Sequence, residues 1–295
     1  MFAETTIKRW DGIQKFFASF SKSPGWIFRG HADAAWPLNT SLQRTADDYK
    51  IRSKFLPIVE RIMLERFQSV AHHYLQYSPK DSDRIEWLSI LQHHGGITRL
   101  LDCTRSFYVA LYFALESSVT RDACAWCISM YKLLKPANDG LGKWRQAHAT
   151  SNVWNVNDPM YYDATSTANS FVGISEFNTN VVIPVMPQKL NTRMSIQQGI
   201  FLFATNLSIS FLDNLYAMLG ASSVYYESFD YLRDDCDDYY VIKLIIPHGC
   251  HKEIIDDLER MNINAASLFP GLDGYARSLK YSLRIFDPAG WGITP

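Results

Sequence analysis

Residues 106–118, SFYVALYFALESS, constrain the fold more than any other segment, because they are apolar around almost the whole circumference of a helix. A helix without a polar face has to be buried on all sides. Either Thr104 or Ser106 is placed to cap its first turn. The sequence therefore predicts a buried helix near the middle of the chain, with other elements packed around it.

The character of the chain changes on either side of this helix. Helical patterns predominate before it, and strand patterns follow it. An early strand at residues 26–29 is the exception. The predicted helices span residues 4–20, 50–77, 84–94 and 251–261, and the later strands span 123–131, 181–186, 199–204 and 239–246.

This order predicts an α+β fold and not the strict alternation of a doubly wound sheet. We expect the early strand to join the later ones in one mixed or antiparallel sheet flanked by helices. Residues 135–180 are expected to be loops with short elements, and the acidic segment 227–238 a solvated loop. Nothing in the sequence divides residues 1–295, so a single domain is expected.

Composition limits the functional classes. The chain has a net charge of -1, so it lacks the overall basic bias of a dedicated duplex-binding domain. No apolar run approaches the roughly 20 residues of a membrane helix, and the N-terminus has no apolar core of a secretory signal. Five scattered cysteines fit a reducing compartment better than a disulfide framework. We therefore expect a cytoplasmic protein without membrane attachment.

The common catalytic and metal-binding motifs are absent. The sequence contains no GxxxxGK[ST], GxGxxG, HExxH or GxSxG. Cys124 and Cys127 have CxxC spacing, but positions i and i+3 of a strand point to opposite faces. The adjacent pairs His72-His73 and His93-His94 diverge by about 100° on a helix and make no chelate by themselves. No metal site is expected.

Three polar features stand against this apolar background. Arg29 ends a strand that is expected to be buried, and its guanidinium needs a partner, because uncompensated burial of a charge costs several kcal/mol. Asp102 and Thr104 lie between two apolar helices, where polar groups are normally paired. Gly199, after Gln197 and Gln198, interrupts an apolar strand, as glycine does where a backbone or ligand approaches closely.

These segments together resemble the FRG-domain family over about residues 20–280. The resemblance is carried by several motifs in the same order, and three departures leave the charged motif residues in place. The departures are His31 for a common Gln, Cys103 for a common Trp, and the small pair Gly95-Gly96. The matching motifs are Phe28-Arg29-Gly30, Trp36-Pro37-Leu38, Ser41-Leu42-Gln43-Arg44, His93-His94-Gly95, Thr98 to Thr104, Ala110 to Ala114, Gln197-x-Gly199-x-Phe201, and Leu268 to Gly274.

The order of these motifs also looks like the layout of ADP-ribosyltransferases, which implies that NAD is a substrate. By this resemblance Arg29, with Gly30 and His31 beside it, would bind the NAD phosphate or ribose. Thr104 and Tyr108 would flank the nicotinamide pocket. The catalytic group that orients the reacting ribose would be Gln197, Gln198 or Asp102.

The resemblance further implies a bacterial effector or toxin in phage defence or a toxin–antitoxin system. Its acceptor would be a protein, RNA or DNA, and an antitoxin or other protein would restrain it. Residues 197–199 lack a glutamate, and an amide offers only a dipole to an oxocarbenium-like transition state. Either Asp102 or another acid such as Glu176 takes that role, or the site binds without turnover.

Two other interpretations stay open. In the first, the chain is a non-enzymatic module that binds a nucleotide or nucleic acid through a cleft of arginines. In the second, it is a protein-interaction domain in which Arg29 pairs with Asp102 and joins the strand to the central helix. The arginines of the first interpretation are Arg29, Arg44, Arg99, Arg105 and Arg193.

Overall fold

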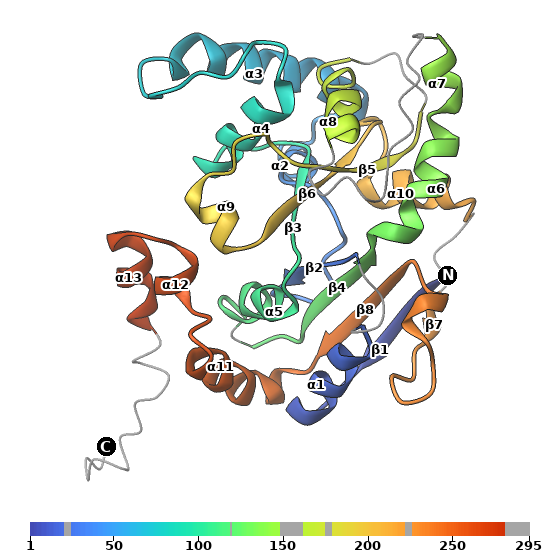
Figure 1. Cartoon of the computed structure of the whole chain (residues 1–295), viewed down its shortest axis with the longest axis vertical. Helices are drawn as coiled ribbons and strands as arrows, with labels where there is room; N and C mark the ends of the chain where they lie inside the picture. Colours follow the sequence, from blue (N-terminus) through green and yellow to red (C-terminus); the bar gives the residue numbers. More distant parts are fainter. Residues whose placement is uncertain (21–24, 119, 148–161, 175–178, 222–225, 281–295) are drawn as a thin grey trace.

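The computed structural model describes residues 1–20, 25–118, 120–147, 162–174, 179–221 and 226–280. One eight-stranded sheet runs through these residues, in the order β5-β6-β3-β2-β4-β8-β1-β7 (Figure 1). The strands are β1 Phe2–Thr6, β2 Trp26–His31, β3 Leu100–Thr104, β4 Ala123–Ser129, β5 Val182–Val185, β6 Gly199–Ala204, β7 Tyr226–Ser228 and β8 Val241–Ile246. β1 pairs in parallel with β7 and β8, and the other strand pairs are antiparallel. The predicted α+β class with a mixed sheet is confirmed.

Helices cover both faces of this sheet. A large core cluster lies between the strands and α1, α5 and α11. A second cluster joins β3, β5 and β6 to α3, α4 and α6–α8, and a third places α10 against the sheet. The helices are α1 Trp10–Ser19, α2 Ser41–Asp48, α3 Leu56–Ala71, α4 Arg84–His93, α5 Phe107–Leu115, α6 Met130–Gly140, α7 Gly142–Ala147, α8 Tyr162–Asn169, α9 Thr192–Ile196, α10 Phe211–Leu219, α11 His251–Arg260, α12 Ala265–Leu268 and α13 Leu272–Ser278.

Several local predictions were wrong. Residues 4–20 were expected to be one helix, but β1 precedes α1, because two neighbouring strands offer β1 a complete ladder. β3 was missed between its flanking helices, and β7 occupies part of the acidic segment 227–238 that was predicted to be a loop. α6 begins inside the predicted strand 123–131 and extends into segment 135–180, where α7 and α8 are two of the short elements expected there.

The prediction that Cys124 and Cys127 are core cysteines is confirmed. Cys124 and Cys127 are free, buried, and part of core clusters on opposite faces of the sheet. In the part of the chain that the structure describes, no helix has both the length and the apolar character needed to cross a bilayer.

The predicted central helix is α5, and it packs directly on β2. Ser106 caps it, with Oγ accepting the Val109 N–H at 3.3 Å. A Cβ added to Gly30 would lie 2.0 Å from the Ala110 carbonyl oxygen and 2.5 Å from the Ala114 nitrogen. Gly30 is therefore required for the close approach of the helix backbone to the strand.

We predict that Gly30→Ala destabilises the protein by roughly 3 kcal/mol, the upper end of the usual range for overpacking, because the clash is with backbone atoms that cannot rotate away. Chemical denaturation measures the change. Gly142→Ala is the control, since an added Cβ there meets nothing within 4 Å. Equal stability of the two variants would contradict the prediction.

A buried ion pair joins α3 to Arg99, the residue immediately before β3. Arg99 is completely buried, and its Nε donates to Glu60 Oε1 at 2.6 Å while Nη2 bonds the other Glu60 oxygen. Nη1 donates to the Ala204 and Thr205 carbonyls, both at 3.3 Å. Glu60 Oε2 also accepts the Gly173 N–H at 2.9 Å. Arg99 therefore has a structural role, with its charge and most of its donors satisfied inside the protein.

We predict that Glu60→Gln destabilises the protein by about 3–5 kcal/mol, because the Arg99 charge would stay buried without its counter-charge. The double variant Glu60→Leu/Arg99→Met should be more stable than the single variant, since it removes both charges. Urea unfolding tests this, with Lys135→Ala at the exposed Lys135–Asp139 pair as a control expected to change little. A single variant as stable as this control would refute the assigned role.

Candidate functional site

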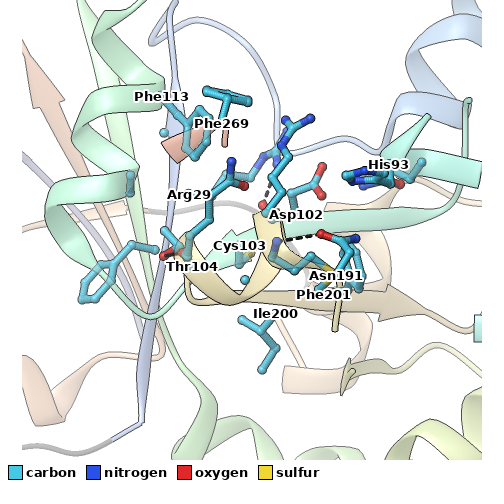
Figure 2. Close-up of a pocket in the computed structure, with 18 of the residues that line it drawn as sticks. Arg29, His93, Asp102, Cys103, Thr104, Phe113, Asn191, Ile200, Phe201 and Phe269 are labelled. Atoms are coloured by element: carbon cyan, nitrogen blue, oxygen red, sulfur yellow. Dashed lines mark hydrogen bonds between the residues drawn. The ribbon is translucent and has the colours of Figure 1, made fainter. Parts of the chain in front are cut away.

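A cavity of about 410 Å³ opens where β2 and β3 separate. These strands share one registered residue pair, Phe28 with Thr104, whereas β3 pairs with β6 along its whole length. Residues of β2, β3, β6, α4, α5, α9 and the C-terminal segment 269–277 line the cavity. Its volume lies within the range of small-molecule sites. Arg29, Asp102 and His93 meet in it, with Phe113 and Phe269 on one side and Asn191, Ile200 and Phe201 on the other (Figure 2).

Arg29 spans the gap between the two separating strands. Its Nη1 donates to the main-chain carbonyl of Asp102 at 2.6 Å, and its Nε donates to His31 Nε2 at 3.0 Å. Both acceptors are neutral. No carboxylate of the described residues forms an ion pair with Arg29, so the interpretation of a structural Arg29–Asp102 ion pair is not supported. The charge of Arg29 stays available to an anion from outside.

His31 fixes the direction of the Arg29 side chain from behind the cavity. Burial lowers the pKa of His31 to about 3, and the positive charge of Arg29 adds to this effect. The imidazole is therefore neutral at physiological pH and can accept the Arg29 Nε–H. The Trp126 indole nitrogen lies 3.3 Å from His31 Nδ1 and confines the ring from the other side.

Asp102 places an exposed carboxylate in the cavity beside several arginines. Burial lowers the pKa of Arg44 and of Arg193, and the Asp102 charge opposes the shift at both. This shows that the carboxylate lies within electrostatic range of both guanidiniums. Burial also lowers the pKa of His93, with further lowering by His94 and Arg193, which favours a neutral imidazole.

Thr104 and Gln197 line the cavity, but their polar groups are used in contacts with the protein itself. Thr104 Oγ1 donates to the Gln197 carbonyl at 2.6 Å and accepts the Ser106 N–H at 3.0 Å. Gln197 Nε2 donates to the Leu268 carbonyl at 2.9 Å. The Gln197 amide thus joins α9 to α12.

Three of the expected site residues are not part of the cavity lining. His31 lies behind Arg29, and Gln198 is exposed with φ 50°. Tyr108 packs into the core, with ring centroids 5.1 Å from Phe17 and 6.2 Å from Trp10. The structure therefore brings together Arg29, Gly30, Asp102, Thr104 and Gln197. Glu176 lies outside the described residues.

The arginines expected to share one cleft are also separated by the fold. Arg99 is buried against Glu60, and Arg105 lies against Met186 outside the cavity lining. Arg44 donates to the Asn39 carbonyl at 2.6 Å. Arg29 and Arg193 remain as the two members of that set that line the cavity.

Some cavity residues, among them Glu116, Arg277, Phe269 and His93, were assigned no role from sequence. Glu116 and Arg277 form a bidentate ion pair, and both guanidiniums of Arg193 and Arg277 lie over the Phe269 ring. Phe269 belongs to the Leu268–Gly274 motif, which was the one sequence signal for this wall. His93 belongs to the His93-His94-Gly95 motif.

A possible metal-binding group lies elsewhere. The ligand atoms of Asp235, Cys236 and Asp237 lie within 4.8 Å of one another in the described part of the chain. Exposed carboxylates often cluster in this way without a metal, and none of these three residues lines the cavity.

Comparison with known proteins assigns the region around the cavity to a family. Residues 24–123 match the family model of the FRG domain. The chain carries an FRG domain. No curated protein and no solved structure matches the chain at a significant level.

The matched segment of the FRG domain supplies one part of the cavity. It contains β2, β3, α4 and α5, and thus Arg29, Asp102, Thr104 and Glu116. The other wall comes from α9, β6 and segment 269–277, beyond the matched residues. Both parts are needed to enclose the site.

We predict that the stability lost between pH 6.5 and pH 4.5 is smaller in His31→Gln than in the wild type. The pKa of His31 is about 3 in the folded state and near its ordinary value in the unfolded chain. The unfolded state therefore binds an extra proton in this window, and stability falls as the pH falls, by up to roughly 1.4 kcal/mol per pH unit. Glutamine keeps an acceptor for Arg29 and does not titrate.

Unfolding free energies measured across this pH range provide the test. His72→Gln, at an exposed histidine just after α3, is the matched control and should follow the wild type. Parallel curves for His31→Gln and the wild type would show that folding does not lower the pKa of His31, and would contradict the prediction.

Proposed function

We propose that this protein is an NAD-dependent ADP-ribosyltransferase and that NAD binds in the cavity between β2 and β3. One observation carries the proposal: the guanidinium of Arg29 and the carboxylate of Asp102 line the same cavity, and neither has an ion-pair partner among the described residues. The 2.6 Å hydrogen bond from Arg29 Nη1 to the Asp102 main-chain carbonyl holds the guanidinium beside the residue that carries this carboxylate.

Arg29 is suited to hold a phosphate of NAD. A guanidinium offers parallel donors that match phosphate oxygens, and its charge does not depend on pH. The neutral His31 and the Asp102 carbonyl orient the side chain without cancelling its charge. Because the group is already held in place, little side-chain entropy is lost when an anion binds.

Asp102 is suited to stabilise the transferring ribose. In ADP-ribosyl transfer the bond between ribose C1′ and the nicotinamide nitrogen breaks, and its electron pair leaves with neutral nicotinamide. The acceptor then forms a bond to C1′ and releases a proton. Positive charge develops on the ribose between these events, and a nearby carboxylate stabilises it.

Asp102 fits this role better than the other candidates at the cavity. Glu116 is engaged by Arg277 through both oxygens, and the Gln197 amide is bonded to the Leu268 carbonyl. Asp102 is exposed to the cavity. Phe113 and Phe269 add an aromatic wall, with ring centroids 6.1 Å apart, against which a nicotinamide or adenine ring can pack.

The acceptor and the biological setting are proposed from the family resemblance. We propose a macromolecular acceptor, which is protein, RNA or DNA, and a role as a toxin or defence effector in the bacterial cytoplasm. Such an activity would need a restraining partner such as an antitoxin.

A nucleotide-binding module without turnover is the second candidate. It is favoured by the absence of a glutamate at residues 197–199 and by the structural use of Gln197. The two candidates share the ligand and differ in whether the glycosidic bond breaks.

We predict that the purified protein transfers label from NAD carrying a labelled adenylate phosphate to a component of a bacterial lysate. Asp102→Asn should lower the rate by about 10²–10³-fold while changing NAD affinity little, because it removes stabilisation of the transition state. Arg29→Ala should weaken NAD binding by about tenfold or more, because a charged hydrogen bond is lost. Arg66→Ala, at an exposed arginine of α3, is the control.

The outcomes separate the candidates. NAD binding without label transfer or nicotinamide release, in a folded protein with every acceptor class present, would assign the chain to the binding-module class. Absence of NAD binding would overturn both candidates. Transfer that is unaffected by Asp102→Asn would remove Asp102 from the mechanism.

A further inference from the structure

A second guanidinium, that of Arg193 on α9, lines the cavity from a different element than Arg29. Its Cζ lies 4.4 Å from the centroid of the Phe269 ring. Arg277 lies over the same ring at 4.2 Å. Phe269 is therefore in contact with two arginines, and these two arginines have different electrostatic environments.

Arg277 is neutralised and Arg193 is not. Both oxygens of Glu116 accept hydrogen bonds from Arg277. Within the described residues, no ion pair or hydrogen bond of the Arg193 guanidinium is found. Burial lowers the pKa of Arg193 and the charge of Arg277 adds to this effect, while Asp102 and Glu116 oppose the shift without forming an ion pair with Arg193 among the described residues. Arg193 is thus a partly desolvated cation with free donors directed to a cavity.

Charge complementarity indicates what these donors bind. Arg29, Arg193 and Arg277 line the cavity together with Asp102 and Glu116, so the cavity carries one net positive charge when His93 is neutral. Arg277 and Glu116 offset each other's charge through their ion pair. The two remaining arginines, Arg29 and Arg193, can balance two negative charges on a ligand. An anion next to Asp102 is repelled by that carboxylate, and both guanidiniums are needed to offset this repulsion.

We infer that Arg29 and Arg193 form a two-point anchor for a diphosphate, each guanidinium binding one of two linked phosphate groups of the cavity ligand. This inference deepens the proposed function by naming the group that the site recognises. It rests on that function for the choice of NAD as the natural ligand. Recognition of a diphosphate does not itself require transfer.

The surrounding structure holds Arg193 ready to bind. Asn191 caps α9, with Oδ1 accepting the Met194 N–H at 2.8 Å. Gln197 Nε2 at the end of α9 bonds the Leu268 carbonyl next to Phe269. A Cβ added to Gly274 would lie 1.7 Å from the Phe269 carbonyl oxygen, so α13 packs tightly against Phe269. A stacked and anchored guanidinium keeps its orientation at a lower entropic cost than a free side chain.

Calorimetric binding of ADP-ribose and of AMP tests the inference, because the first ligand has two linked phosphates and the second has one. The wild type should bind ADP-ribose more tightly than AMP. Arg193→Gln should weaken ADP-ribose binding by about tenfold or more and remove most of the difference between the two ligands. Arg193→Lys should give an intermediate affinity, since it keeps the charge and loses the planar fork.

Arg66→Ala is again the matched control, and thermal unfolding checks that each variant is folded. Undiminished ADP-ribose binding by Arg193→Gln, with binding lost in Arg29→Ala, would overturn the inference and leave the proposed function standing. ADP-ribose binding that depends on both arginines, without any transfer from NAD, would support the inference and overturn the transferase. Equal loss of AMP and ADP-ribose binding in Arg193→Gln would contradict a two-phosphate anchor.

Discussion

The site depends on the separation of β2 and β3 immediately after the pair Phe28–Thr104. Beyond this point the two strands no longer pair. The Arg29 side chain donates a hydrogen bond to the Asp102 main-chain carbonyl across the gap. The packing of α5 on Gly30 holds β2 on one side of the gap, and the ladder to β6 holds β3 on the other. The cavity is therefore a consequence of how the sheet is assembled.

Arginines in this protein differ in function because their partners differ. Arg99 is buried with a carboxylate and two carbonyls around it, and it joins α3 to the sheet. Arg29 is held by two neutral acceptors, so its charge is not cancelled. The Arg193 guanidinium stacks on the Phe269 ring and has no ion-pair partner among the described residues. Neutralisation by a carboxylate, more than burial alone, separates the structural Arg99 from the arginines that we propose bind a ligand.

The lining of the cavity is distributed over two parts of the chain. The FRG domain matched at residues 24–123 contains Arg29 and Asp102, whereas Arg193 and Phe269 follow much later. The contacts Arg277–Glu116 and Gln197–Leu268 bring the late segment onto α5 and α9. In this site Arg29 and Asp102 lie on strands, and helices complete the lining of the cavity. This arrangement suits a ligand that is enclosed from two sides.

The sequence by itself determined the elements whose signals are local. The all-apolar helix, the strand that ends at Arg29, the α+β class and the FRG motifs all follow from patterns within a few residues. Tertiary structure alone decided that residues 2–6 form a strand, that Glu60 neutralises Arg99, and that Gln197 bonds Leu268. It also brought Arg193 and Phe269 to the cavity. These outcomes depend on partners distant in sequence, and periodicity carries no information about which distant backbone or charge a residue will meet.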